Sequence, residues 1–464
     1  MKELNELLGA ISGFLWGWPM IVLLLGTHLF LTVRLRFPQR HIFKAIRLSV
    51  QKDEGADGDV SQFGALVTAL AATIGTGNIV GVGTAIALGG PGAVFWCWLT
   101  GILGIATKYG EGLLAIKYRV AAEDGKMQGG PMYALERGLG MKWLGVLFAI
   151  FTAVASFGIG STVQANAIST MGQNVFGTEP VVIGGIITIL ASMVIVGGVK
   201  NIAKVCTALV PFMAILYVIG CIVILCMNLE FVWPAIRLIV VSAFNPEAAG
   251  GGFVGAGIMM AARYGIARGL FSNESGLGSA PIVAAAAKTK NPVRQALVSS
   301  TGTFWDTVVI CAITGIVIVS SILAFPDISF ENGGELTTKA FSKIPYIGAP
   351  LLAFGSLTFA FSTILGWSYY GERAVEYMAG KTRLKKRFGI KPIINIYRVI
   401  FLITVYLGAV VSLDLVWNLA DIFNALMAIP NLISLIFLSG VIVKETRQYL
   451  WQKCVALVKV DTEG

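Results

Sequence analysis

The first residues whose types could do chemistry stand inside an apolar segment. Residues 71–78 read AATIGTGN, at the centre of a stretch, 62–88, that is otherwise apolar enough to cross a membrane. Backbone groups at that depth need partners, so such an interruption persists only where protein buries it or where it lines a polar cavity. Free N–H groups near Gly75, Thr76 and Gly77 would suit a carboxylate, and Asn78 adds a side-chain donor. The pattern predicts a broken helix that binds a small anionic group.

A second glycine cluster, GGGFVGAG at 250–257, opens another apolar stretch, 251–268. Unwound carbonyls around Gly251 to Gly257, those of Gly255 and Gly257 included, would accept hydrogen bonds from an ammonium group, and Phe253 could close over a bound side chain. Gln164, in STVQANAIS, could contribute its amide oxygen, although an amide inside a helical bundle equally often joins two helices. The alternative for both clusters is that the glycines only permit close helix packing. We favour two breaks, because Thr73, Thr76 and Asn78 add polar groups that packing does not require.

A pair of hydroxyls suggests a cation site. Ser362 and Thr363 are adjacent in FAFSTILGWSYYGE, and the break at 71–78 would free the carbonyls of Ala71 and Ile74. Sodium prefers such oxygen shells, and the C-terminal ends of half-helices in membranes attract cations. The alternative is that both hydroxyls bond back to carbonyls of their own helix. Trp367, one turn beyond Thr363, could close over a bound side chain.

Three ionisable residues lie within apolar stretches and are therefore functional candidates. Lys108 and Glu111 are three positions apart, and we predict that they form an ion pair on one helix face. Asp306 has no opposite charge three or four positions away. It could titrate, which leaves proton coupling through Asp306 or Glu111 as an alternative to sodium.

The amino-acid composition indicates whether the chain folds in water or in a membrane. Of 464 residues, 56% are hydrophobic and 13% are charged, which is typical of a polytopic membrane protein. Six scattered cysteines and two histidines show no spacing typical of a zinc site or a disulfide framework. The N-terminus lacks a basic start and a cleavage site, so we expect the first apolar run to be retained as a helix.

Eleven apolar windows are long enough to span a membrane. They lie near 14–33, 62–88, 91–116, 144–170, 181–198, 204–227, 251–268, 293–323, 347–370, 394–413 and 416–443. With the N-terminus outside and the C-terminus inside, 30 of the 35 Lys and Arg residues fall in inner loops. This asymmetry favours that orientation and explains the net charge of +10 without nucleic acid.

After one leading helix, ten spans remain, and the two glycine-broken ones open two sets of five with opposite orientation. We therefore predict a leading segment, 1–60, two inverted five-helix repeats, 61–230 and 231–443, and a cytoplasmic tail, 444–464. Broken helices at matching positions of inverted halves indicate the binding site of a secondary transporter.

Two long motifs resemble a known family. TALAATIGTGNIVGVGTAIALGGPGAVFWCWLTGILG at 68–104 and RGLFSNESGLGSAPIVAAAAKTKNPVRQ at 268–295 are similar to the alanine or glycine:cation symporters, also called sodium/alanine symporters. One departure is Cys97, where that family usually has methionine, which concerns packing. The resemblance implies an all-α, leucine-transporter-like fold in the plasma membrane. It also implies that the chain symports alanine or glycine with sodium and needs no cofactor.

From the residues and the resemblance together we expect two groups of site residues. The substrate-binding group is Thr73, Gly75, Thr76, Gly77, Asn78, Gln164, Phe253, Gly255, Gly257, Thr363 and Trp367. The sodium group is Ala71, Ile74, Ser362 and Thr363. A channel or receptor would show a repeated pore motif or a large ligand-binding domain, and a membrane enzyme would show a catalytic or metal motif. The short loops and inverted halves favour transport.

Overall fold

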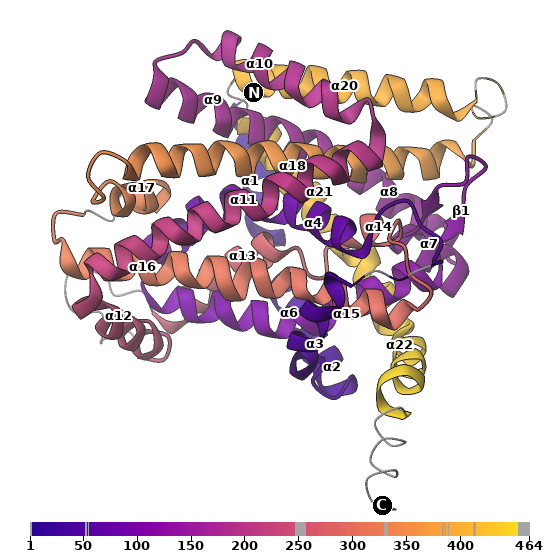
Figure 1. Ribbon diagram of the computed structural model, residues 1–464, viewed down its shortest axis with the longest axis horizontal. Helices are drawn as coiled ribbons and strands as arrows, with labels where there is room; N and C mark the ends of the chain where they lie inside the picture. The colour runs from indigo at the N-terminus through magenta and orange to yellow at the C-terminus, as the bar shows by residue number, and fades with distance from the viewer. Residues whose placement is uncertain are drawn as a thin grey trace, which may run out of the picture.

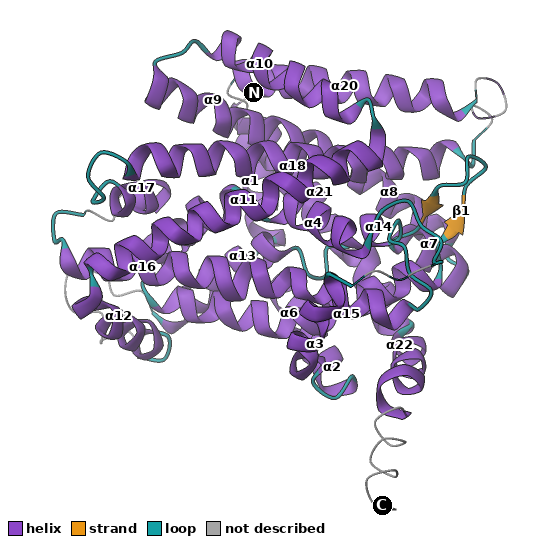
Figure 2. Ribbon diagram, viewed as in Figure 1, coloured by secondary structure: helices purple, strands orange, loops and turns teal. Residues whose placement is uncertain are grey.

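The computed structural model describes residues 2–51, 53, 55–245, 257–328, 333–382, 385, 387, 389–411 and 414–452. The described part is helical apart from one antiparallel pair of two-residue strands, β1 and β2, in which Val120 faces Gln128 (Figure 2).

The first half of the chain forms the following elements in order, where η marks a short 3₁₀ or π-helical segment. They are α1 (Lys2–Leu15), α2 (Trp18–Arg34), η1 (Pro38–His41), α3 (Ile42–Ser49), α4 (Gln62–Thr73), η2 (Gly77–Gly81), α5 (Val82–Gly89), α6 (Gly92–Lys117), β1 (Val120–Ala121), β2 (Met127–Gln128), α7 (Pro131–Tyr133), η3 (Ala134–Gly138), α8 (Lys142–Phe157), η4 (Gly158–Thr162), α9 (Val163–Phe176), α10 (Pro180–Ile195), α11 (Gly198–Met227) and α12 (Leu229–Ser242).

The second half continues in the same way. Its elements are α13 (Ile258–Asn273), α14 (Ala280–Ala284), α15 (Pro292–Thr303), η6 (Phe304–Cys311), α16 (Ala312–Ala324), η7 (Gly333–Glu335), α17 (Leu336–Phe341), α18 (Gly348–Ala379), α20 (Ile390–Val410), α21 (Asp414–Phe437), α22 (Ser439–Thr446) and η8 (Arg447–Trp451).

Every predicted span overlaps helical residues of the described part, although 251–256 of the span 251–268 lie outside it. Among the described residues, seven helices are long and apolar enough to cross a membrane, and the bent pair Gln62–Thr73 with Gly77–Gly89 makes eight. The other predicted spans correspond to α6, α10 and α13, and α10 and α13 have only 16 residues each. The chain is therefore a multi-pass, all-helical membrane protein. Helix α12, which lies at the predicted boundary between the two repeats, was not predicted.

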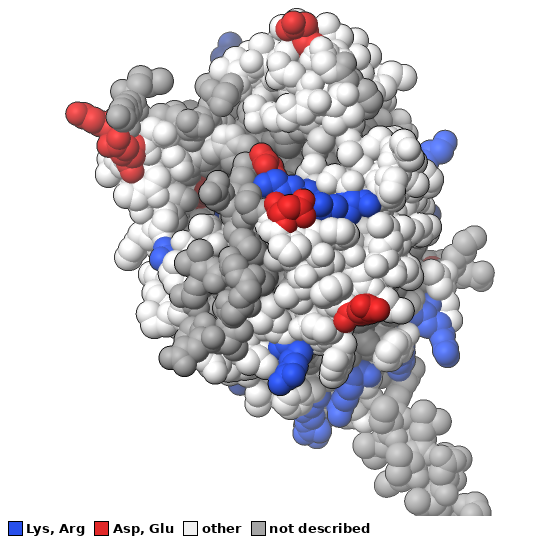
Figure 3. Space-filling view, turned by 90° about the vertical axis from the view of Figure 1, so that its left-hand side faces the viewer, with Lys and Arg blue, Asp and Glu red and all other residues white. Residues whose placement is uncertain are grey.

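The long helices α6, α11, α16, α18 and α20 run in a similar direction across the molecule (Figure 1). Helix α6 packs against α13 and α15, and α18 packs against α8, α9 and α11. The connections around β1 and α7 gather at one end of this bundle, and α12 and α17 lie at the other end (Figure 1). Charged side chains on the face that carries α12 and α17 are sparse and of both signs (Figure 3).

Glycines let α13 approach α6 closely. A Cβ atom at Gly269 would lie 3.1 Å from the carbonyl oxygen of Cys97, and one at Gly265 would overlap the backbone of Ala93. Small residues at such crossings permit the close contact that packs helices in lipid. This contact fixes the position of the C-terminal end of α13.

Two helices are interrupted in the middle of the bundle. The first interruption bends α4 away from the following helix by 54° at residues 74–76. The second follows Asn273, where Glu274, Gly276 and Gly278 adopt positive φ angles of 52°, 91° and 87° before α14 begins. The predicted second break at 250–257 is a different segment, and its residues 250–256 lie outside the described residues. The interruption at 274–279 was not predicted.

Candidate functional site

The first break is organised by Asn78. Helix α4 starts at Ser61, whose hydroxyl accepts the N–H of Gly64 at 2.9 Å, and it ends where Ile74 turns to an extended conformation with ψ 96°. The Asn78 side-chain oxygen then accepts the N–H of Gly75 at 2.9 Å. The first N–H groups of the next half-helix, at Thr76 and Gly77, have no acceptor within their own helix. The break therefore presents two donors at mid-depth.

Asn78 also connects the break to Asp306. Its amide nitrogen donates to the Asp306 carboxylate at 2.7 Å, and the hydroxyls of Ser272 and Thr307 donate to the other carboxylate oxygen at 2.9 and 2.7 Å. Asp306 is thus fully partnered by residues distant in sequence or adjacent to it. Both ends of the Asn78 amide are therefore engaged by protein groups, and Asn78 is not among the residues that line the cavity beside this break.

A narrow cavity opens against this break. Six predicted substrate-binding residues line it: Thr73, Gly75, Thr76, Gly77, Gln164 and Thr363. The remaining lining residues are Ala72, Ile159, Phe271, Ser272, Glu274 and Asn424. The structure therefore brings together segments from widely separated parts of the sequence.

One buried acceptor, the side-chain oxygen of Gln164, lies near the donors of the break. The side-chain oxygen of Gln164 is buried without a hydrogen-bond partner among the described residues, while its nitrogen donates to the carbonyl of Ile159 at 3.2 Å. This oxygen lies 3.9 Å from the place of a Cβ atom on Gly75. Leaving a buried acceptor unpaired is unfavourable by about 1–3 kcal/mol, so the arrangement is suited to a ligand that carries a donor.

The predicted cation group is partly assembled. The hydroxyls of Ser362 and Thr363 donate to the carbonyl of Ala71 at 3.2 and 3.1 Å, and both also donate to the carbonyl of Phe359 on their own helix, at 2.9 and 3.0 Å. The bonds to Phe359 are the back-bonding that the alternative interpretation expected, and the same hydroxyls also reach the carbonyl of Ala71. Ile74 is buried, and its N–H donates to the carbonyl oxygen of Leu70 at 2.8 Å.

Two other predicted residues, Trp367 and Gly257, do not line this cavity. Trp367 is fully buried behind it, with its Cβ atom packed against Gly160 and its ring 5.6 Å from that of Tyr370. Gly257 directly precedes α13, at the opposite end of that helix from Phe271. Phe253 and Gly255 lie outside the described residues.

The second break is held by charged side chains of α6. Lys108 donates to the carbonyl of Asn273 at 3.0 Å, whereas Glu111 accepts the N–H of Gly276 at 2.9 Å and the amide of Asn431 at 2.7 Å. The predicted ion pair between Lys108 and Glu111 is therefore wrong. Lys108 binds a carbonyl oxygen on one side of the break, and Glu111 binds a backbone N–H on the other side. Each charge therefore has a backbone partner of opposite polarity.

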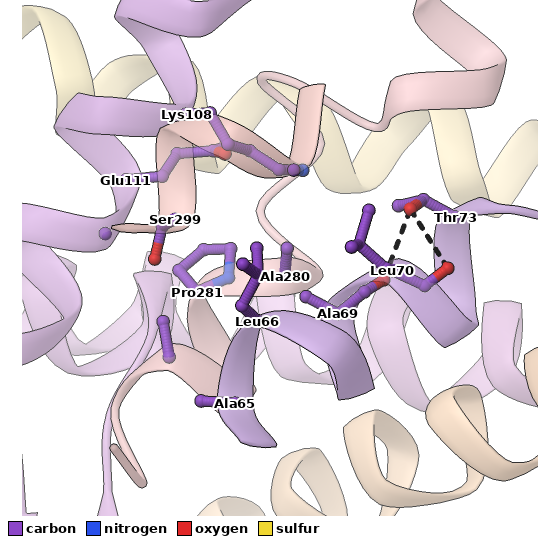
Figure 4. A pocket seen from close by; sticks show the side chains of 13 residues that line it. Ala65, Leu66, Ala69, Leu70, Thr73, Lys108, Glu111, Ala280, Pro281 and Ser299 are labelled. Atoms are coloured by element: carbon purple, nitrogen blue, oxygen red, sulfur yellow. Dashed lines mark hydrogen bonds between the residues drawn. The ribbon is translucent and has the colours of Figure 1, made fainter. Parts of the chain in front are cut away.

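Lys108 and Glu111 border a second narrow cavity. They lie on one side of it, and Leu66, Leu70 and Thr73 of α4 lie on the other (Figure 4). Thr73 lines both cavities, so the two meet at the end of α4. Among the described residues, no three His, Cys, Asp or Glu side chains gather as a metal centre.

Sequence reasoning missed Phe271, Ser272 and Asn424, and it assigned Glu274 to an inner loop, as part of a gate, rather than to this cavity. The stretch SNESGLGS at 272–279 combines polar residues with two glycines, as the first break does, and this signal could have indicated the second. Asn424 was detectable only as a single amide in an apolar span.

Comparison with known proteins identifies the family. Residues 1–461 match the model of the Sodium:alanine symporter family. The chain is 49% identical to the sodium/alanine symporter AgcS of Methanococcus maripaludis, over 96% of this chain and 97% of that protein. It is 52% identical to an uncharacterized transporter of Haemophilus influenzae, over 96% of each chain. It is also 37% identical to the probable sodium/glutamine symporter GlnT of Bacillus subtilis, over 97% of this chain and 91% of that protein.

The fold is also similar to that of MhsT, solved in complex with L-phenylalanine. The TM-score is 0.58 at 16% identity, over 86% of this chain and 95% of that one. MhsT is a leucine-transporter-fold protein, and the likeness confirms that fold for this chain. The chain is thus a transporter rather than an enzyme, and it belongs to the sodium:alanine symporter family.

Proposed function

We propose that this protein uses the sodium gradient to carry small neutral amino acids, alanine and glycine among them, across the plasma membrane by alternating access. In this proposal eleven spans comprise one leading helix and two inverted sets of five. The N-terminus is outside and the C-terminus is cytoplasmic. The observation that carries the proposal is the unpaired Gln164 oxygen beside the free N–H groups of the first break.

The amino-acid zwitterion needs a partner for each charge, because neither can be left unpaired in a dry site. Its carboxylate binds the N–H groups of Thr76 and Gly77, which also carry the positive end of the half-helix dipole. Its ammonium donates to the Gln164 oxygen. Ile159 and Phe271 restrict the room for a side chain, which favours small substrates.

Sodium binds between Ala71, Ile74, Ser362 and Thr363. Support comes from the convergence of both hydroxyls on the Ala71 carbonyl and from the position of the Thr363 hydroxyl, which lies 2.9 Å from the place of a Cβ atom on Gly75. The ion site and the substrate site therefore share one helix break. Filling the first orders the second, and linkage requires the reciprocal effect to be equal.

The energy available is sufficient for one sodium per amino acid. A neutral zwitterion gains nothing from the membrane potential, whereas one sodium ion contributes about 2.3 kcal/mol per 100 mV. A tenfold sodium gradient adds about 1.4 kcal/mol.

The end of the bundle near β1 is the cytoplasmic one in this proposal, and hydrogen bonds between its segments keep it closed. Arg119 donates to the carbonyls of Ala285, Ala287 and Thr289 at 3.2, 2.8 and 3.0 Å. Val60, just before α4, pairs with Ala287 as an isolated parallel bridge. The segments flanking α4 and α14 must separate here to release substrate inward.

The test is uptake of labelled alanine into proteoliposomes with sodium, potassium or a proton gradient as the only driving force. Sodium alone should drive accumulation. Thr363→Ala should raise the sodium concentration for half-maximal uptake far more than it alters alanine binding at saturating sodium, and Thr363→Ser should have little effect. Uptake that follows a proton gradient and ignores sodium would overturn the proposal and direct attention to Asp306 and Glu111.

A further inference from the structure

One buried amide in the substrate cavity has no use in the site described above. Asn424 of α21 is 2% exposed and lines the cavity, and its side-chain oxygen is buried without a hydrogen-bond partner among the described residues. The other two asparagines of α21 are partnered. Asn418 donates to the side chain of Asn5 at 2.8 Å, and Asn431 donates to Glu111.

A buried amide oxygen without a partner is costly inside a protein, because it has lost water without compensation. Helix α21 could carry an apolar residue at this position at no such cost. The unpaired oxygen therefore points to a ligand group that donates a hydrogen bond, as a hydroxyl or the nitrogen of a carboxamide does.

The location of Asn424 separates it from the groups that hold the substrate backbone. Gln164 and the break lie on α9 and around Gly75, whereas Asn424 comes from α21. Trp16 connects α21 with the Phe271 wall of the cavity. Its ring nitrogen donates to the carbonyl of Asp421, one turn before Asn424, at 3.0 Å, and its ring packs edge-on against Phe271 at 5.9 Å.

We propose that Asn424 is a specificity-determining residue that hydrogen-bonds an uncharged polar group on the substrate side chain. Small amino acids with a hydroxyl, and serine first among them, bind more tightly than apolar ones of equal size. Glu274 in the same cavity disfavours acidic side chains. This inference rests on the proposed function, since it uses the same cavity and the same placement of the substrate backbone.

The experiment is competition against labelled alanine on the purified protein in saturating sodium, with L-serine and L-2-aminobutyrate as competitors. These two differ only by a hydroxyl in place of a methyl group. Wild type should prefer serine, and Asn424→Leu, which keeps the side-chain volume, should lower the ratio of serine to aminobutyrate affinity about tenfold. Alanine affinity should stay within about threefold. Asn418→Ala is the matched control and should leave the ratio unchanged.

Three results would overturn the inference. Wild type could bind aminobutyrate as tightly as serine, which decides the matter even if the variant fails to fold. Asn424→Leu could leave the ratio unchanged, or it could weaken alanine and serine equally, which would assign Asn424 to the substrate backbone. Loss of sodium-dependent alanine binding in wild type would instead contradict the proposed function itself.

Discussion

The two helix breaks solve the same problem with different chemistry. At the first, an amide and two hydroxyls satisfy the freed backbone at Gly75 and Ala71. At the second, the ammonium of Lys108 and the carboxylate of Glu111 do so. Neutral hydrogen bonds exchange partners at a net change of about 1 kcal/mol, whereas a buried charge that loses its partner is strongly destabilising. We therefore expect the first break to exchange hydrogen-bond partners readily, as ligand binding requires, and the second break to be the rigid one.

The largest effect on stability is expected when the Glu111 carboxylate is removed from the second break. Glu111→Ala should destabilise the protein by about 2–6 kcal/mol, because the buried Gly276 N–H and the Asn431 amide then both lack an acceptor, at about 1–3 kcal/mol each. Thermal unfolding in detergent measures this loss. Glu445→Ala, which removes a partly exposed ion pair with Lys117, is the control and should cost less than about 1 kcal/mol. Equal losses would show that the second break is not the rigid one.

Filling the first break should abolish binding without abolishing the fold. A Cβ atom on Gly77 would lie 3.7 Å from the ring of Phe271 and 3.8 Å from Ser272, which is ordinary contact. Gly77→Ala should therefore keep measurable binding of labelled alanine, while Gly77→Leu should eliminate it by occupying the space for the substrate backbone. Strain from overpacking should stay near about 1–3 kcal/mol. Alanine binding by the leucine variant would remove the substrate from this break.

Removing the organiser of the first break should have an intermediate effect. Asn78→Ala strands the Gly75 N–H and one oxygen of Asp306, and should weaken alanine binding by about 1–3 kcal/mol in equilibrium binding assays. Thr307→Val removes one donor to Asp306 but leaves Asn78 in place, so its effect should be smaller. Should Thr307→Val prove as harmful as Asn78→Ala, the charge of Asp306 would matter more than the geometry of the break.

The smallest effect is expected outside both breaks, at the connection that carries Glu136. Burial opposes ionisation of this carboxyl, but hydrogen bonds from Lys381 and Tyr377 lower its pKa below the usual 4.5. The pair therefore stabilises the fold above about pH 4.5 and loses that contribution as the pH falls through the lowered pKa. Glu136→Gln should cost less than about 1 kcal/mol at pH 7, and its difference from wild type in thermal unfolding should vanish in acid. A difference that persists in acid would indicate packing instead of charge.

The amino-acid sequence by itself determined the membrane location, the approximate positions of the helices and the first break. Apolar length and glycine conformation act over a few residues, so these features can be seen locally in 62–88 and in its interruption AATIGTGN. The hydroxyl pair at 362–363 was likewise identified by residue type, and the structure places it against Ala71.

Only the tertiary structure decided which polar groups meet. The second break lies at 274–279, Lys108 and Glu111 separate to serve its two sides, and Asp306 finds Asn78 from 228 positions away. Asn424 enters the cavity from the last long helix, and Trp367 remains behind it. A buried charge or amide takes its partner from whichever helix packs nearest. The spacing of Lys108 and Glu111 along one helix therefore predicted the wrong partners. Their actual partners lie on segments that are distant in the sequence and pack beside α6.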